Sequence, residues 1–262
     1  MATSSHTSSL LYHDNHVHTS LSNHGIGEME EYVQAAIAKE LKSLTFLEHM
    51  EEGIVWKKRT WLEKDHFRYF LDEGRRLKEL YRNRIDIGLG VECGYNPDYR
   101  EKLCNRLNEE QWDQVGISCH FLKFPEMKNH LNLFTKSDQD IELARRIGPA
   151  KILTRYFDHL LEAATSLPGT VLCHLDGPLR HLSELQLQKS HYRQIEKLLV
   201  VIKDNDMALE INTSGFRIRG EQFPAGKILD MAATLKLRIV LGSDAHRPDD
   251  VGYDFEKFAS GW

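Results

Sequence analysis

Histidines are crowded near the N-terminus of the chain, in the stretch HDNHVHTSLSNHG (13–25). His16 and His18 lie two residues apart, and His24 follows six residues later. Imidazole nitrogens are ligands for zinc, iron and manganese, and residues two apart in a β-strand face the same side. If this stretch includes a strand, His16 and His18 can therefore bind one metal ion together. One such pair is a weak signal, because a single histidine is more often a surface or core residue.

Further residues of the same chemical types occur along the chain, nearly all at or just after the end of a short apolar run. Together with the first three histidines they make nine candidates: His16, His18, His24, His49, Glu92, His120, His174, Asp244 and His246. Asp244 and His246 repeat the spacing of two residues and can face one site. A set of imidazoles and carboxylates suits divalent Zn, Fe or Mn. Nine candidates in comparable positions indicate a metal site rather than a solvated polar loop.

The apolar runs predict seven buried β-strands, and these strands would hold the nine candidate side chains in position. The runs are 10–19, 43–49, 85–95, 114–120, 170–176, 208–214 and 238–246. Helical patterns, such as those over 29–41 and 224–237, lie between them. Strands that alternate with helices form a parallel sheet, and we predict an α/β barrel in one domain over residues 1–262. Functional side chains of α/β barrels gather at the carboxyl ends of the strands, where the candidates fall.

Other polar residues near the candidates are predicted to support the site without binding a metal. Cys119 and Cys173 each directly precede a candidate histidine. If the histidines point into the barrel, alternation turns these cysteines towards the helices, and we interpret them and Cys93 as packing residues rather than zinc thiolates. We expect Asp14 and Asp176 to orient metal-binding histidines through hydrogen bonds.

Composition excludes several classes of function. The 262-residue chain has a formal net charge of −5, which does not favour a nucleic-acid-binding protein. No apolar run is long enough for a membrane span, and the first residues lack the pattern of a signal peptide. Four cysteines without a CxxC pair do not indicate a disulfide framework. We therefore expect a cytoplasmic protein that acts on a small molecule, while its oligomeric state stays open.

The motifs HDNHVHT, FLEHM, GVECGY, GISCHFL, CHLDGPLR and GSDAHRPDDVG resemble those of the PHP (polymerase and histidinol phosphatase) family. Within that family, HLD, EINTSGFR and SDAHRPDDVG are most similar to the histidinol phosphatases. The resemblance implies a distorted (β/α)7, TIM-like barrel with up to three divalent metal ions (Zn, Fe or Mn). It implies one ion on His16, His18, Glu92 and Asp244, a second on Glu92, His120 and His174, and a third on His24, His49 and His246.

The resemblance also implies metal-dependent hydrolysis of a phosphate monoester, with histidinol phosphate favoured as the substrate. Glu92 and Asp244 would be catalytic through the ions they hold. Arginine binds phosphate through planar, bidentate hydrogen bonds. Arg180 follows the fifth predicted strand, and Arg217 and Arg219 follow the sixth. We predict that Arg180 and Arg217 contact the phosphate during catalysis, with Arg219 as a further candidate; the alternative is that they pair with surface carboxylates.

Three other functions are compatible with the sequence. A phosphoesterase of the same family could act on a nucleotide, a sugar phosphate or phosphotyrosine. An amidohydrolase also carries an HxH pair on its first barrel strand but commonly needs a carbamylated lysine, whereas here Glu92 can bridge two ions. A regulatory or scaffold domain without turnover would be free to lose ligands, and the complete set argues against it.

Overall fold

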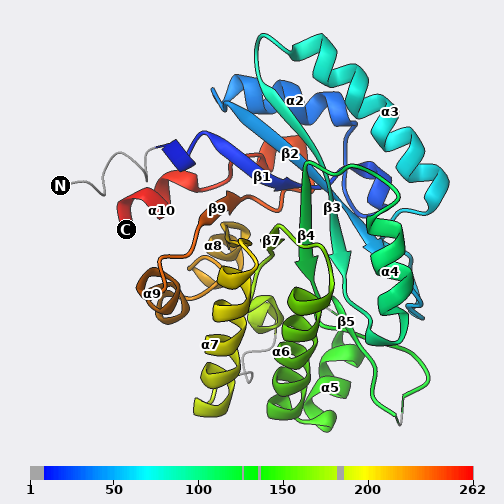
Figure 1. The fold of residues 1–262 in the computed structure, drawn as a ribbon, viewed down its shortest axis with the longest axis vertical. Helices are drawn as coiled ribbons and strands as arrows, with labels where there is room; N and C mark the ends of the chain where they lie inside the picture. The colour runs from blue at the N-terminus through cyan, green and yellow to red at the C-terminus, as the bar shows by residue number, and fades with distance from the viewer. Residues whose placement is uncertain (1–8, 126, 135–136, 182–185, 262) are drawn as a thin grey trace.

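Seven parallel β-strands form the centre of the molecule (Figure 1). The structure, a computed structural model, describes residues 9–125, 127–134, 137–181 and 186–261. The strands are hydrogen-bonded in the order β1-β2-β3-β4-β7-β8-β9. Their bounds are β1 (His13–Val17), β2 (Ser43–Glu51), β3 (Asp86–Gly94), β4 (Gln114–Ser118), β7 (Val171–Leu172), β8 (Ala208–Asn212) and β9 (Ile239–Gly242).

The sheet closes into a distorted barrel through the carboxyl ends of its first and last strands. The His18 amide donates a hydrogen bond to the Ala245 carbonyl, and the Asp244 amide donates one to the His16 carbonyl, both at 2.8 Å. Val17 forms an isolated parallel bridge with Ala245. These contacts confirm the predicted α/β barrel of seven parallel strands and bring the first histidine pair next to the segment after β9.

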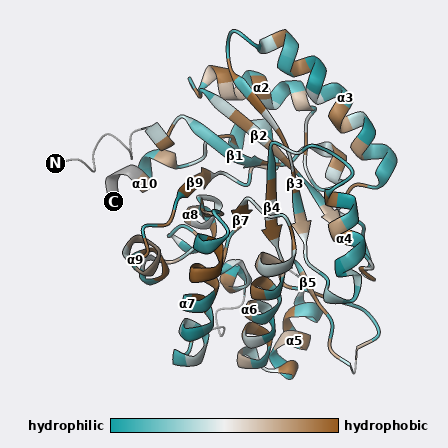
Figure 2. Ribbon diagram, in the orientation of Figure 1, coloured by the Kyte–Doolittle hydropathy of each residue, from teal (hydrophilic) through white to brown (hydrophobic). Residues whose placement is uncertain are grey.

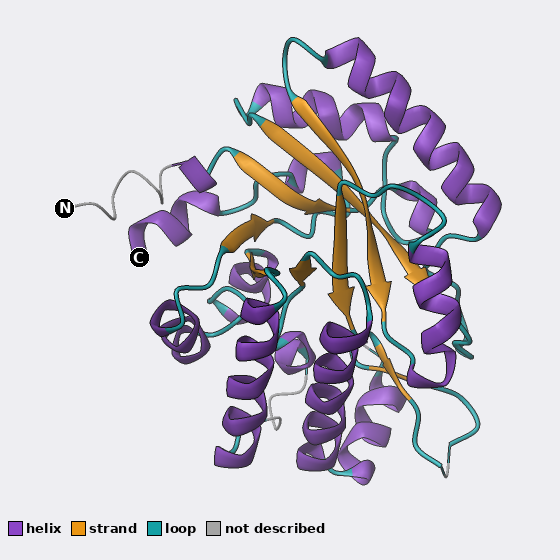
Figure 3. Cartoon of the chain, viewed as in Figure 1, coloured by secondary structure: helices purple, strands orange, loops and turns teal. Residues whose placement is uncertain are grey.

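Helices surround the sheet (Figures 1 and 3). They are α2 (Met29–Ala38), α3 (Lys64–Tyr81), α4 (Arg100–Leu107), α5 (Asp138–Ile147), α6 (Pro149–Ser166), α7 (Lys189–Asp204), α8 (Ser214–Arg219), α9 (Gly226–Thr234) and α10 (Phe255–Gly261). Figure 2 shows hydrophobic residues on β4 and many hydrophilic residues on α3. Within the described ranges, no helix combines the length and the apolar character needed to cross a membrane.

Alternation along β2 shows how the strands place functional side chains. Phe46 packs against Tyr32 and Phe70, which belong to the helices outside the sheet. His49, an odd number of residues further on, therefore faces the other side, into the barrel. Glu51 follows two residues later and shares that inner face. The helix-facing residues supply the hydrophobic core, and the inner face is left for polar groups at the carboxyl end.

Six of the seven strands are shorter than the apolar runs that predict them, and β2 is longer. The largest differences are at β1, β7 and β9, whose predicted runs are 10–19, 170–176 and 238–246. His174 has a φ of 23° and Asp244 a φ of 53°, and residues in this left-handed region cannot continue a strand. Both belong to the nine candidates. The sequence also gave no indication of the antiparallel pair β5 (Phe121–Leu122) and β6 (Leu131–Asn132), because strands of two residues carry no readable period.

Candidate metal centre

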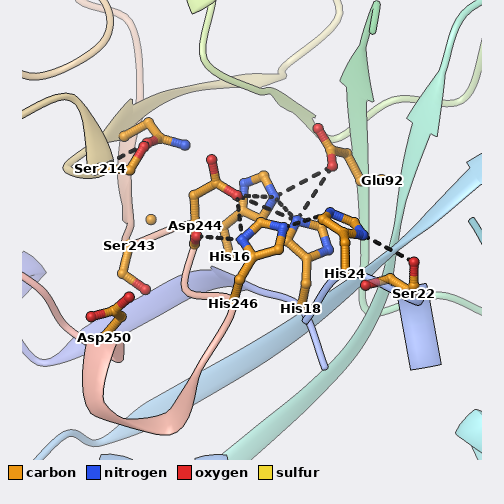
Figure 4. A network of polar contacts seen from close by, with 12 residues as sticks. His16, His18, Ser22, His24, Glu92, Ser214, Ser243, Asp244, His246 and Asp250 are labelled. Atoms are coloured by element: carbon orange, nitrogen blue, oxygen red, sulfur yellow. Dashed lines mark hydrogen bonds and ion pairs between the residues drawn. The ribbon is translucent and has the colours of Figure 1, made fainter. Parts of the chain in front are cut away.

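All nine candidate ligands meet at the carboxyl end of the barrel. In Figure 4, four imidazoles gather between the carboxylates of Glu92 and Asp244. Glu92 lies on β3 and is fully buried. Its Oε1 lies 2.7 Å from His174 Nε2 and 3.0 Å from His120 Nε2. Its Oε2 lies 2.8 Å from His49 Nδ1. The Glu92 carboxylate therefore sits at the centre of the cluster, with an oxygen directed to each side.

The pair on β1 is directed at the same carboxylate and at Asp244. The Nε2 atoms of His16 and His18 are only 2.8 Å apart. They lie 3.6 and 3.5 Å from Glu92 Oε2, and 4.0 and 3.5 Å from Asp244 Oδ1. These two histidines and two carboxylates thus present four donor atoms to one small volume.

A second close pair lies towards the outside of the cluster. His24 Nε2 and His246 Nε2 are 2.8 Å apart. Their Nδ1 atoms are held by main-chain carbonyls, that of His24 by Ser22 and that of His246 by Asp244, each at 2.9 Å. An Nδ1–H that donates to a carbonyl leaves the Nε2 lone pair free for a ligand. Both imidazoles are therefore in the tautomer that a metal ligand requires.

The donor set fits divalent metal ions. Groups of three donors within 4.8 Å of one another include His16, His18 and Asp244; His49, Glu92 and His120; and His18, His49 and His246. Glu92 Oε2 is buried and makes no hydrogen bond, although His49 Nδ1 lies 2.8 Å from it. A buried polar atom left in this state is costly unless an ion or a hydrogen bond satisfies it. Nitrogen and carboxylate ligands together suit Zn, Fe or Mn.

The ionisation state of the cluster differs from one histidine to the next. Burial lowers the pKa of His18 well below its usual value and that of His24 to about 3, so both rings are neutral. Burial alone would raise the pKa of Glu92, but the charges of His120 and its neighbours outweigh this and hold the pKa well below the usual range. Asp244 behaves in the same way beside His18.

Burial would lower the pKa of His16 and His120, but the charges of Glu210 and Glu92 outweigh it and raise both, that of His120 to about 10. These two rings carry a proton that a metal ion would displace, since neutral imidazoles and ionised carboxylates are the forms that bind metals.

Two glutamates that the sequence analysis did not single out hold ligand histidines in place. Glu51 Oε1 lies 2.7 Å from His120 Nδ1, and Glu210 Oε1 lies 2.5 Å from His16 Nδ1. Alternation could have identified both, since Glu51 follows His49 by two residues and Glu210 lies between the helix-facing Leu209 and Ile211 of β8.

The prediction that Asp14 and Asp176 orient the histidines is wrong. Asp14 accepts hydrogen bonds from the amide and hydroxyl of Ser243 and from the Gly252 amide, and it contacts the main chain of His16 rather than its ring. Asp176 accepts a hydrogen bond from the Ala225 amide. Both carboxylates therefore join neighbouring segments of the fold rather than contact the ligand imidazoles.

Two of the three cysteines pack as predicted, and Cys173 does not. Cys93 and Cys119 belong to the main hydrophobic cluster, and the Sγ of Cys119 contacts the Phe121 carbonyl. Cys173 does not face the helices: it packs inside the barrel, with Leu47. The left-handed conformation of His174 interrupts the alternation, so that Cys173 and His174 share one side. Burial raises the pKa of the Cys119 and Cys173 thiols, which disfavours the binding of a metal ion by their thiolates.

A cavity of about 540 Å³ opens over the cluster. It is lined by His24, His49, Glu51, Trp56, Lys58, Thr60, Glu92, His120, Phe121, Asn132, Phe134, His174, Arg180, Asp244 and His246. Arg180 is the only predicted phosphate ligand among them. Its Nη2 donates to Ser214 Oγ and Asp244 Oδ2, both at 3.1 Å. Lys58 is a second cation of the lining that the sequence analysis missed, because it lies in a loop without a motif.

Arg217 and Arg219 are directed elsewhere. Arg217 makes a bidentate pair with Asp250, with both distances 2.7 Å, and its guanidinium lies 4.1 Å from the centre of the Tyr253 ring. Arg219 Nη2 donates to Glu221 Oε1 at 2.9 Å, and its Nη1 lies 3.7 Å from Oδ2 of the buried Asp176. The pair of Arg217 with Asp250 is the surface pairing that the sequence left open as the alternative, whereas Arg219 pairs with one surface and one buried carboxylate. A contact between Arg217 and phosphate would require the pair with Asp250 to open.

Comparisons with known proteins agree with this geometry. The family model described as the PHP domain matches residues 14–214. A protein named "Probable histidinol-phosphatase" from Deinococcus radiodurans is 29% identical, over 92% of this chain and 89% of its own length. The histidinol-phosphatase of Bacillus subtilis is 26% identical, over 94% of this chain and 97% of its own length.

A solved structure shares the same fold. The histidinol phosphate phosphatase of Lactococcus lactis subsp. lactis, complexed with Zn, L-histidinol and phosphate, superimposes with a TM-score of 0.75. It is 18% identical in sequence, and the match covers 95% of this chain and 92% of that chain. The distorted barrel is therefore an architecture that an experimentally solved protein also adopts.

Proposed function

The chain belongs to the PHP domain family, and on this premise we propose that it is a metal-dependent phosphatase that hydrolyses histidinol phosphate, a step of histidine biosynthesis. The observation that carries the proposal is the convergence of nine imidazole and carboxylate groups, seven of which line one cavity that also contains Arg180. Relatives named as histidinol-phosphatases match almost the whole chain and support the choice of substrate.

We assign up to three divalent ions to this centre, as Zn, Fe or Mn. The proposed ligands are His16, His18, Glu92 and Asp244 for one ion, Glu92, His120 and His174 for a second, and His24, His49 and His246 for a third. His49 lies between the last two groups, because its Nδ1 lies 2.8 Å from Glu92 Oε2 while its ring stacks on that of His24, with 5.0 Å between the ring centres. When bound, divalent ions stabilise charge on phosphoryl oxygens and lower the pKa of water.

Arg180 is the proposed phosphate ligand. Its guanidinium lies over the rings of Phe134 and Phe223, 5.1 and 5.2 Å from their centres, and Asp244 and Ser214 hold its Nη2. These contacts fix the orientation of the group before substrate binds. Its Nε is buried and has no hydrogen-bond partner. A preorganised charged donor stabilises a phosphoryl group more than a mobile one, since no reorganisation is needed in the transition state.

The outer wall of the cavity is suited to a flat leaving group. The Trp56 and Phe121 rings contact each other at an interplanar angle of 60°, with 5.6 Å between their centres, and the centre of the Phe134 ring lies 5.2 Å from that of His120. Aromatic walls bind planar rings by stacking and by burial of apolar surface. Phosphate occupies only a part of about 540 Å³, which leaves room for the imidazole ring of histidinol. Lys58 adds positive charge that favours an anionic substrate.

Release of phosphate from a panel of esters tests the proposed substrate. With the metal-replete protein, we expect kcat/KM for L-histidinol phosphate to exceed that for a nucleoside monophosphate, a sugar phosphate and phosphotyrosine by at least about tenfold, because the aromatic wall fits a small planar ring. A faster reaction with another ester would assign a different substrate to the same centre. Hydrolysis of amides or lactones with no phosphate release would favour an amidohydrolase, and no turnover at all would favour a regulatory domain.

A further inference from the structure

We infer that Glu210 is a positioning residue that couples two of the proposed metal ions, an inference that rests on the proposed metal-dependent function. Glu210 lies on β8, is 1% exposed and is not part of the cavity lining. Its two carboxylate oxygens serve different ligand histidines. Oε1 lies 2.5 Å from His16 Nδ1, and Oε2 accepts a hydrogen bond from the His174 amide at 2.7 Å. The first histidine is assigned to one ion and the second to another.

The contact with His16 fixes the state of its ring. A carboxylate at Nδ1 keeps the proton on that nitrogen and leaves the Nε2 lone pair directed at the metal ligands Glu92 and Asp244. The negative charge behind the ring also makes Nε2 a stronger donor. Removal of this carboxylate would free the ring to adopt the other tautomer.

The contact with His174 acts through the main chain. His174 has a φ of 23°, a conformation that a residue with a Cβ adopts only when its surroundings impose it. The hydrogen bond from its amide to Glu210 Oε2 supplies part of that constraint. In this conformation the ring reaches Glu92 Oε1 at 2.7 Å. Without Glu210 the backbone would relax, and the ring would be withdrawn from the centre.

The fold reserves space for this carboxylate. Gly242 lies opposite on β9, and a Cβ added there would come within 2.3 Å of Glu210 Oε1 and 2.7 Å of His16 Cβ. Asn212 Nδ2 donates a third hydrogen bond, to Oε2 at 3.3 Å. These contacts hold the Glu210 carboxylate in one position between β8 and β9. A change in that position would therefore alter its hydrogen bonds to both His16 and His174. Alanine at position 242 would push the carboxylate out of place.

Glu51 provides a matched control. It is also a buried glutamate on the inner face, but its hydrogen bond goes to one ligand only, at His120 Nδ1. If every buried glutamate stabilised the metal centre in the same way, loss of Glu51 and loss of Glu210 would weaken the same number of metal sites. If Glu210 couples two ions, its loss should weaken two sites and the loss of Glu51 only one.

Zn²⁺ binding to the full chain tests this assignment, with stoichiometry and affinity measured by competition with a chelator. We expect the E210Q variant to weaken two Zn²⁺ sites by about ten- to a hundredfold and E51Q to weaken one. The E210A variant should lose more affinity than E210Q, because glutamine still accepts a hydrogen bond. The spectrum of bound Co²⁺ should change with E210Q, as the ring of His16 is reoriented.

The outcomes separate this inference from the proposed function. If E210A does not fold, E210Q still tests the inference, since it keeps the size of the side chain and removes only the charge. Parental affinity in E210Q, or a loss at one site only, would overturn the coupling role. Equal weakening of every site together with lower thermal stability would show a merely structural role. A parent chain that binds no Zn²⁺ would overturn the proposed function and this inference with it.

Discussion

The Glu92→Gln variant is expected to lose most of its bound metal and to show kcat/KM reduced by about a thousandfold or more. Glu92 contacts five of the ligand histidines, at distances from 2.7 to 3.6 Å. An amide has one acceptor oxygen and no charge, so it can neither bridge two ions nor balance their charge. A loss of several kcal/mol of transition-state stabilisation corresponds to this factor. Elemental analysis and phosphate release on the same preparation would measure both effects.

Cys119→Ser is the control for Glu92→Gln. Cys119 is buried at the carboxyl end of β4, next to His120 in sequence, but its Sγ is directed at the Phe121 carbonyl. This variant should keep the parental metal content. If Glu92→Gln retained both metal and activity, the bridging role would belong to another residue.

Arg180→Ala is expected to keep its metal content while kcat/KM falls by about ten- to a hundredfold or more. A hydrogen bond to a charged group contributes about 1.5–3 kcal/mol, and alanine removes the donor without replacing it. Arg180→Lys should recover only part of the activity, because an ammonium keeps the charge but not the planar arrangement of donors. Steady-state kinetics with the best phosphate monoester would measure the loss of kcat/KM, and metal analysis of the same preparation would show whether the metal content is unchanged.

Arg217→Ala is the matched comparison for Arg180→Ala. Arg217 is held by Asp250 outside the cavity lining, so we expect a smaller loss of kcat/KM than at Arg180. An equal loss would mean that the pair with Asp250 opens when substrate binds. Parental rates in both alanine variants would show that the phosphate pocket lies elsewhere.

The barrel and the gathering of the ligands could be predicted because each depends on a short-range pattern. The seven apolar runs each contain a strand, and eight of the nine candidates lie near strand ends, where parallel topology brings them together, while His24 lies in the loop after β1. The exact ends of the strands could not be predicted. His174 and Asp244 adopt left-handed conformations that only the closed barrel imposes, and the inward position of Cys173 follows from this.

The supporting contacts depended on partners distant in sequence. Glu210 supports His16 across 194 residues, and Arg217 meets Asp250 across 33. Nothing local distinguishes an arginine that points into a cavity from one that pairs with a surface carboxylate. The role of Asp14 could not be predicted for a related reason, since its hydrogen-bond partners Ser243 and Gly252 lie near the C-terminal end of the sequence. The assignment of ligands to individual ions stays a prediction.

The most direct test of a metal-dependent phosphatase is the rate of phosphate release from L-histidinol phosphate as a function of the number of divalent ions bound per chain. Protein stripped with a chelator should release phosphate no faster than the buffer. Activity should return as ions are restored, and it should saturate close to three ions per chain, the number that nine ligands of this kind can hold. Full activity in the stripped protein, or saturation at one ion or fewer, would contradict the account.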